Sequence, residues 1–329
     1  MRCILILLVG VVAISGCTSY TPQPTALHTA PPEIERTPLP PGEPFRFTVV
    51  ADNRPTGSKR QAFQWTLNEM NRLVGGEGAF LVMAGDFDPP AVTDQDFRAA
   101  FGPAMLWYPA VGNHEAETRE DMEWVRQRYN HLPYIVRQGP AGSETTTYSF
   151  DYGSAHFVVL NQYFDGQTDH KGKGDVCDAL YEWVKADLEA TRQSVIFVVG
   201  HEPAFPQGRH TGTSLDQYRA NRDRFWKLLN EHEVVAYFCG HTHSYGRLQK
   251  GGAEQRAVTW QVDAGNCGQG KPQTFIDVRV TDAAVNFNVY SGTRGREFTR
   301  TDSWTHVLDR KVNQATGDQQ LDYQSVASY

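Results

Sequence analysis

The stretch Gly240-His241-Thr242-His243-Ser244-Tyr245-Gly246-Arg247 decides the fold of this protein, because four other segments repeat its pattern of an apolar run that ends in polar residues. In an open α/β sheet the carboxyl ends of the strands face the ligand crevice, so we expect these side chains to gather in one place. A Gly before the polar residue allows the backbone to approach closely. The four other segments are Ala51-Asp52-Asn53-Arg54, Gly85-Asp86-Phe87-Asp88, Gly112-Asn113-His114-Glu115 and Gly200-His201.

The apolar runs before these segments are continuous, which is typical of strands covered on both faces. Segments with apolar residues near helical spacing lie between them and predict an α/β protein. The predicted strands are 47–51, 80–84, 108–111, 157–160, 195–199 and 234–238, followed by alternating strands at 257–262, 274–280 and 284–290. The predicted helices are 61–73, 117–129, 177–190 and 217–232.

Composition limits the classes of function. The chain has 329 residues and a formal charge of −7, with 40% hydrophobic and 12% aromatic residues. This apolar content is enough for a large core and excludes wholesale disorder. The acidic balance and the lack of a basic run argue against a broad nucleic-acid surface. Composition does not indicate an oligomeric state.

The N-terminus predicts export. Residues 1–16 have the short apolar core of a signal peptide, too short to span a bilayer comfortably. The end of this segment, Ile14-Ser15-Gly16-Cys17, resembles a bacterial lipobox, which implies lipidation of Cys17 and a membrane anchor without a transmembrane helix. Thr18, rather than Asp, resembles the signal for sorting to the outer membrane. An ordinary cleaved signal or an uncleaved anchor is the alternative.

The rest of the chain divides into three parts. Residues 17–44 are rich in Pro and predict an extended tether, 45–300 predict one folded domain, and 301–329 predict a loosely packed polar tail. The predicted folded domain has three cysteines, Cys177, Cys239 and Cys267, so they cannot all pair with one another. A Cys239–Cys267 disulfide and buried free thiols are both open from the sequence.

Taken in order, the five polar segments resemble the calcineurin-like metallophosphoesterase superfamily over Phe47 to Tyr245. The blocks around Asn113 and His241 look closest to its purple-acid-phosphatase-like branch. The resemblance implies a four-layer αββα sandwich, in which helices flank two mixed β-sheets around two metal ions. It also implies that Asp86 bridges the ions, that Asn113, His201 and His241 complete the second site, and that Asp52 and His243 serve the first.

The donor types are consistent with hydrolysis of phosphate esters. Imidazole and carboxylate ligands together suit Fe, Mn or Zn. Two such ions polarise a phosphoryl oxygen and activate water for in-line attack. The resemblance implies that His114 protonates the leaving group or steadies the equatorial oxygens. The expected substrate is a small phosphate ester, and the rival hypothesis is a surface protein that binds phosphorylated ligands through one metal without turnover.

The first site departs from the family pattern. Most of the superfamily has Asp-x-His where this chain has Asp52-Asn53-Arg54, and an arginine cannot ligate a cation. The third residue after Asp86 is Pro89, so the iron-binding Tyr of purple acid phosphatases is absent there. We therefore expect weaker binding at the first site. Arg54 either clamps the phosphate or marks the loss of one metal, and we favour the clamp because the other ligand positions are intact.

Four further residues are candidates around the cleft. Tyr163 follows a predicted strand, His210 lies in a Gly-rich loop after His201, and Tyr245 ends the last polar block, so we expect each to contact substrate. Asp88 is a candidate replacement ligand for the first metal, but we favour a capping or solvated Asp at this position.

Overall fold

The computed structural model describes residues 36–251 and 258–308. The predicted signal peptide, Cys17 and most of the predicted tether lie outside these residues. Within the described ranges, no helix has the length and apolar character needed to cross a membrane.

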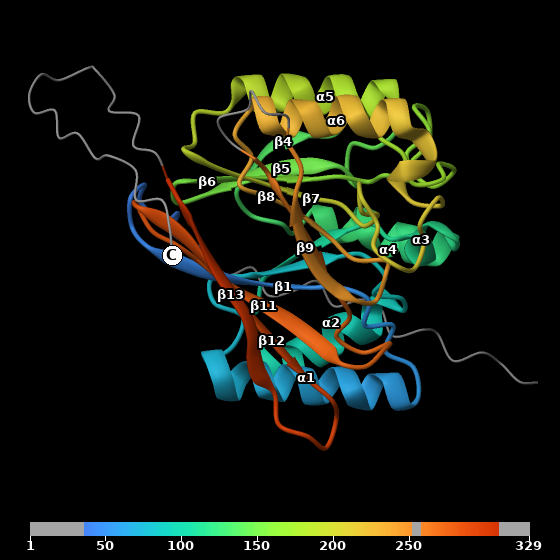
Figure 1. Ribbon diagram of the computed structural model, residues 1–329. Helices are drawn as coiled ribbons and strands as arrows, with labels where there is room; N and C mark the ends of the chain where they lie inside the picture. The colour runs from blue at the N-terminus through green and yellow to red at the C-terminus, as the bar shows by residue number, and fades with distance from the viewer. Residues whose placement is uncertain (1–35, 252–257, 309–329) are drawn as a thin grey trace, which may run out of the picture. The chain divides into compact units, whose positions relative to one another are not determined.

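Two mixed sheets form the centre of the fold (Figure 1). In the first, β1 runs parallel to β2 and β2 to β3, whereas β11 is antiparallel to β1. Its order is β13 (Thr299–Val307), β12 (Ala284–Gly292), β11 (Gln273–Val280), β1 (Phe45–Val50), β2 (Leu81–Ala84) and β3 (Trp107–Ala110). In the second, β6, β7, β8 and β10 are parallel neighbours. Its order is β4 (Ile135–Gln138), β5 (Tyr148–Tyr152), β6 (Ala155–Val159), β7 (Val195–Val199), β8 (Ala236–Cys239), β10 (Trp260–Ala264) and β9 (Tyr245–Gln249).

Helices cover the outer faces of both sheets. Figure 1 shows α1 (Ser58–Val74) and α2 (Pro90–Phe101) beneath the first sheet, and α5 (Asp178–Ala190) and α6 (Arg219–Glu231) above the second. Two short connections, α3 (Asn113–Ala116) and α4 (Arg119–Tyr129), follow β3, and the 3-10 turn η1 (Leu215–Tyr218) precedes α6. The predicted four-layer αββα arrangement is confirmed.

An aromatic core joins the inner faces of the sheets. The ring of Phe47 on β1 lies 5.1 Å from Phe157 on β6 and 5.2 Å from Phe197 on β7, both edge to face. All three side chains are fully buried. This packing holds the two sheets face to face, so the carboxyl ends of β1, β2, β3, β7 and β8 deliver their loops to one edge.

The sequence missed one of the layered helices and four strands. It did not predict α2, which begins after Pro89 with Pro90 at its first turn and buries only Pro90, Thr93, Asp96 and Phe97. It also missed β4, β5, β9 and β13. The edge strands β4, β9 and β13 bury too little to leave an apolar run in the sequence. In β5 the residues Tyr148, Ser149 and Phe150 are buried, but polar residues interrupt the apolar ones.

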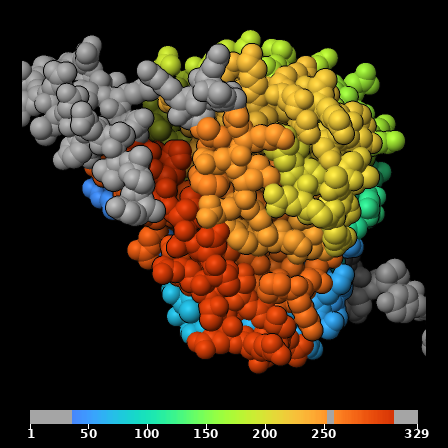
Figure 2. Space-filling view, in the orientation of Figure 1, coloured from blue at the N-terminus to red at the C-terminus, as the bar shows by residue number. Residues whose placement is uncertain are grey.

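The predicted boundary at residue 300 is wrong, because β13 continues to Val307 as the edge strand of the first sheet. Its Trp304 stacks on Phe287 of β12 with ring centroids 4.4 Å apart. Figure 2 shows the orange β9 region beside the red β13 on this face. The rest of the predicted tail, 309–329, lies outside the described residues.

The sequence left open a Cys239–Cys267 disulfide or buried free thiols, and in the structure these cysteines are free. Cys239 and Cys267 are buried and unpaired, and Cys177 is partly buried. Burial raises the pKa of the thiols of Cys239 and Cys267 well above the ordinary value. These two thiols therefore act as small apolar core groups.

Candidate metal centre

The five polar segments meet at one edge of the sandwich, as predicted. Asp52 follows β1, Asp86 follows β2, Asn113 begins α3 after β3, His201 follows β7, and His241 and His243 follow β8. The backbone is left-handed at four of these residues, with φ of 54° at Asp52, 56° at Asp86, 70° at His241 and 59° at His243. Such conformations cost non-glycine residues roughly 1 kcal/mol or more each and cluster at functional sites.

Two glycines allow the backbone to approach the candidate ligands Asp52 and Asp86 closely, as the sequence indicated. A Cβ atom on Gly240 would lie 2.4 Å from Oδ2 of Asp52, and one on Gly112 would lie 2.4 Å from Oδ1 of Asp86. Any larger residue at either position would displace a candidate ligand.

The second metal site is a convergence of lone pairs. His201 Nδ1 donates to the carbonyl oxygen of Ala84 at 2.8 Å, which leaves Nε2 without a proton in the neutral ring. That Nε2 lies 3.3 Å from Asp86 Oδ1, 3.3 Å from Asn113 Oδ1 and 3.2 Å from His241 Nδ1. His241 Nδ1 lies 3.1 Å from Asn113 Oδ1. With the ring proton of His241 on Nε2, the oxygens of Asp86 and Asn113 and the two imidazole nitrogens are four lone-pair atoms at separations that suit a shared cation.

The first metal site has fewer donors. Asp52 Oδ2 accepts the backbone N–H of His241 at 2.9 Å, but its Oδ1 is buried without a hydrogen-bond partner. This orphaned oxygen lies 3.3 Å from Nε2 of His243. Ligand atoms of Asp52, Asp86 and His201 all lie within 4.8 Å of one another. The residues present therefore fit a metal pair that shares Asp86.

Electrostatics among the protein groups favour a bound cation. Burial, together with repulsion from Asp86, raises the pKa of Asp52 well above its ordinary value. Burial and the neighbouring His201, His210 and His243 lower the pKa of His241 to about 2. Burial and Arg209 lower the pKa of His243 to about 4. Both imidazoles are therefore neutral near pH 7, which is the form that ligates metal.

Glu115 is a site residue that the sequence analysis did not single out. Its fully buried carboxylate accepts three backbone N–H groups, from Asp86 at 2.9 Å, Phe87 at 2.7 Å and Gly112 at 2.8 Å. It thereby ties the loop after β2 to the loop after β3, which carry Asp86 and Asn113. Its place two residues after Asn113 was the only available signal.

Arg54 lies beside the first site, where its guanidinium group contacts two other side chains. It makes a two-point ion pair with Asp88, and its Nη1 donates to Nε2 of His114 at 2.7 Å. Nδ1 of His114 therefore carries the ring proton, which it donates to Glu117 at 3.0 Å. Asp88 pairs with Arg54 here, and no contact links its carboxylate to Asp52 or His243 among the described residues.

A sequence comparison decides the family. Residues 45–245 match the profile described as calcineurin-like phosphoesterase, and this match covers more than half of the chain. The chain belongs to the calcineurin-like phosphoesterase family. The family implies a dinuclear metal centre, and the structure has a candidate metal-binding cluster of Asp52, Asp86 and His201.

Relatives within the family include purple acid phosphatases. The chain is 27% identical over 143 residues to purple acid phosphatase 23 of Arabidopsis thaliana, covering 42% of this chain but only 28% of that relative. It is 26% identical over 234 residues to tartrate-resistant acid phosphatase type 5 of Rattus norvegicus, covering 64% and 69%. The structure of purple acid phosphatase PPD1 from Lupinus luteus superposes with a TM-score of 0.54 at 14% identity, covering 88% of this chain and 58% of that one.

A pocket of about 450 Å³ opens over the second metal site of this phosphoesterase domain. Asn113, His241, Tyr163 and His210 all line it, so two of the predicted substrate contacts reach the cleft. The ring of His210 lies 3.9 Å from that of His241. Tyr163 is buried, and its hydroxyl donates to Oε1 of Glu202 at 2.8 Å.

Tyr245 does not line this pocket. Its hydroxyl donates to Oδ2 of Asp302 on β13 at 2.6 Å, and Arg247 donates to the same oxygen at 2.7 Å. Tyr245 therefore links the edge strands of the two sheets, and its contact with substrate stays a prediction. The sequence did not predict β13, so it did not predict Asp302 as the partner of Tyr245.

Proposed function

We propose that this protein hydrolyses small phosphate esters at a dinuclear metal centre. One observation carries the proposal: four lone-pair atoms, from Asp86, Asn113, His201 and His241, lie 3.1–3.3 Å from their neighbours around one point. Two bound transition-metal ions supply polarisation of the phosphoryl oxygen and activation of water. Fe, Mn and Zn are the candidates for both positions, because the donors are nitrogen and oxygen.

The chain's own residues hold the reacting groups. Asp86 faces both metal positions, while Asn113, His201 and His241 hold the second and Asp52 and His243 hold the first. Glu115 fixes the loop that carries Asp86, since three backbone N–H groups depend on its carboxylate. Because fewer protein atoms can ligate a metal at the first position, that position binds metal more weakly than the second.

Arg54 acts as the phosphate clamp in this proposal, and His114 positions it. A guanidinium matches the oxygen geometry of a phosphate, and Arg54 can exchange the Asp88 carboxylate for phosphate oxygens. His114 Nε2 accepts from Arg54, so in this arrangement it steadies the clamp. Protonation of the leaving group by His114 requires Arg54 to turn away first.

The location of this activity is part of the proposal. A lipidated Cys17 would anchor the protein in the cell envelope, with the outer membrane as the destination that Thr18 indicates. Labelling with a radioactive fatty acid, lost in a Cys17→Ser variant, tests this anchor. A label that persists in the variant would contradict it.

Hydrolysis of p-nitrophenyl phosphate and of its bis-ester, measured with Mn, Zn and Fe, tests the reaction. We expect cleavage with at least one metal and a loss of about 10³-fold or more in His241→Ala. His131→Ala is the matched control, because His131 is exposed outside the cleft.

The alternative is a binding protein that keeps one metal and does not turn over. The observation that favours it is Arg54 itself, which brings a positive charge to the side of the site where the family pattern has a ligand. If no ester is cleaved while phosphorylated ligands still bind in a metal-dependent way, this alternative replaces the hydrolase.

A further inference from the structure

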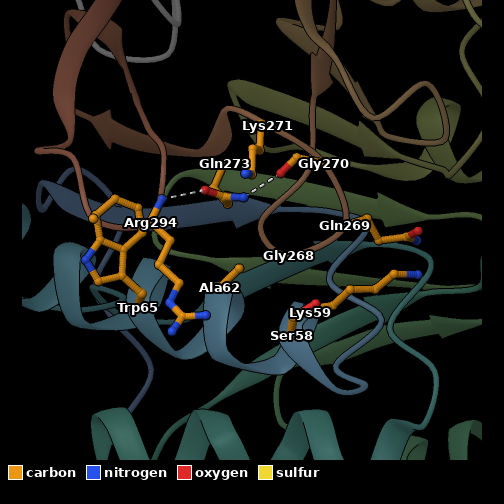
Figure 3. A pocket seen from close by; sticks show the side chains of 11 residues that line it. Ser58, Lys59, Ala62, Trp65, Gly268, Gln269, Gly270, Lys271, Gln273 and Arg294 are labelled. Carbon is orange, nitrogen blue, oxygen red and sulfur yellow. Dashed lines mark hydrogen bonds between the residues drawn. The ribbon is translucent and has the colours of Figure 1, made fainter.

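A second pocket, of about 760 Å³, lies between α1, the loop that joins β10 to β11, and the loop that joins β12 to β13 (Figure 3). None of the residues that line it is acidic, although the chain as a whole carries a charge of −7. Three of them are cations, namely Lys59, Lys271 and Arg294. Trp65 closes one end of the pocket, with its ring 4.7 Å from that of Phe298.

These three cations differ from the other basic residues nearby. Arg60, the next residue on α1, pairs with Asp96 at 2.9 Å. Among the described residues no ion pair involves Lys59, Lys271 or Arg294. Unpaired cations that share one acid-free pocket repel one another, and an anion between them would relieve this repulsion.

Hydrogen bonds hold the wall of the pocket in place. Gly270 N donates to Asn266 Oδ1 at 2.6 Å, Arg294 N donates to Gln273 Oε1 at 3.3 Å, and Gln273 Nε2 donates to the carbonyl oxygen of Gly270. Nε2 of Gln269, which also lines the pocket, is buried without a partner. In Figure 3 the Gln269 amide points to the same side as the amine of Lys59, away from Lys271 and Arg294.

The same loop touches the first metal position. Gln269 N donates to the carbonyl oxygen of Asp52 at 3.3 Å, and Nδ2 of Asn266 donates to that of His243 at 3.0 Å. Gln269, which lines the pocket, is thus bonded directly to the backbone of the candidate ligand Asp52.

We propose that this pocket binds a phosphate group, specifically the second phosphate of a substrate whose first phosphate lies at the metal centre. Lysine, arginine and amide N–H groups are the donors that phosphate oxygens accept. The assignment to substrate rests on the proposed hydrolase function, whereas the binding of phosphate by the pocket does not. The assignment to substrate defines the substrate class as esters that carry two phosphate groups.

A binding experiment tests the pocket by itself. Inorganic tripolyphosphate is titrated calorimetrically into the full chain in the His241→Ala background, which weakens the competing metal centre. We expect Lys271→Gln combined with Arg294→Gln to raise Kd about tenfold, because two charge-assisted contacts are lost. The matched control, Lys185→Gln with Lys227→Gln, removes the same charge from exposed positions on α5 and α6 and should leave Kd unchanged. Equal Kd values in both double variants would overturn the proposal.

A kinetic experiment tests the assignment to substrate. The KM of fructose 1,6-bisphosphate is divided by the KM of p-nitrophenyl phosphate, and we expect Lys271→Gln with Arg294→Gln to raise this ratio about tenfold. An unchanged ratio with weakened tripolyphosphate binding would assign the pocket to free phosphate and overturn the substrate class. If the wild type cleaves neither ester, the hydrolase function fails, and the calorimetric result still decides the pocket.

Discussion

Arg54 and Asp88 form a two-point ion pair at the edge of the metal centre, with Arg54 Nε 2.7 Å from Asp88 Oδ1 and Arg54 Nη2 3.2 Å from Asp88 Oδ2. The pair stands where the family pattern has an imidazole ligand. A guanidinium repels a cation and attracts a phosphate, which is why we propose Arg54 as a phosphate clamp.

Removing the charge of Arg54 should therefore impair catalysis more than metal binding. In Arg54→Gln we expect kcat/KM for p-nitrophenyl phosphate to fall about 100-fold, since a charge-assisted two-point contact is worth roughly 2–3 kcal/mol. The variant Arg54→Lys keeps the positive charge but loses the two-point geometry of the guanidinium group. Its kcat/KM should lie between those of the wild type and Arg54→Gln. Asp88→Asn is the control, because it frees the guanidinium without removing it. Equal kcat/KM in wild type and Arg54→Gln would contradict the clamp.

The metal count should distinguish the two positions. Mass spectrometry of the metal-loaded protein is expected to find about two ions per chain, and about one in Asp52→Ala, which strips the first site of its orphaned carboxylate. His131→Ala should match the wild type. A wild-type content of about one ion that Asp52→Ala does not change would show that only the second position binds metal.

Glu115 should support both stability and metal binding. In Glu115→Gln one carboxylate oxygen becomes an NH₂ group that faces backbone donors, which leaves a buried donor unsatisfied. We expect the free energy of unfolding in urea to fall by about 2–4 kcal/mol and metal affinity to fall about 10-fold or more. Glu117→Gln, at an exposed position nearby, is the control for stability. Unfolding curves that coincide for wild type and Glu115→Gln would refute this role.

His156 should make stability depend on pH. Its side chain is buried, with Nδ1 2.7 Å from Asp151 and Nε2 3.0 Å from Asp187. Burial lowers the pKa of His156, but the bonds and charges of the two carboxylates outweigh it and raise the pKa to about 9. Because the folded pKa exceeds the unfolded value of about 6.5, the stabilisation is complete below pH 6.5 and is lost as pH rises through 9.

The test of His156 is urea unfolding between pH 6 and pH 10. The wild type should lose about 2–3 kcal/mol of stability across this window through His156. The variant His156→Gln should lose less over the same window, whereas the exposed His131→Gln should behave as the wild type. Parallel curves for wild type and His156→Gln would show that the imidazolium does not contribute.

The sequence predicted the α/β class and the gathering of polar side chains at the strand ends for a common reason. Continuous apolar runs such as Val195–Val199 mark strands buried on both faces, and polar residues directly after them must lie at strand ends. It did not predict β13 or α2, because neither buries a periodic apolar face of its own. For that reason the hydrogen bond from the Tyr245 hydroxyl to Asp302 was not predicted.

The sequence by itself determined which side chains gather at the ends of the strands, since Asp, Asn and His directly after apolar runs are a local property of the chain. Only the tertiary structure decided how their atoms are used: that His201 turns Nδ1 to Ala84 and leaves Nε2 free, and that Glu115 gathers three backbone N–H groups. It also paired Arg54 with Asp88 and placed Lys59, Lys271 and Arg294 around one pocket. These residues are far apart in the chain, and their contacts depend on how the two sheets and their loops pack, which no local pattern encodes.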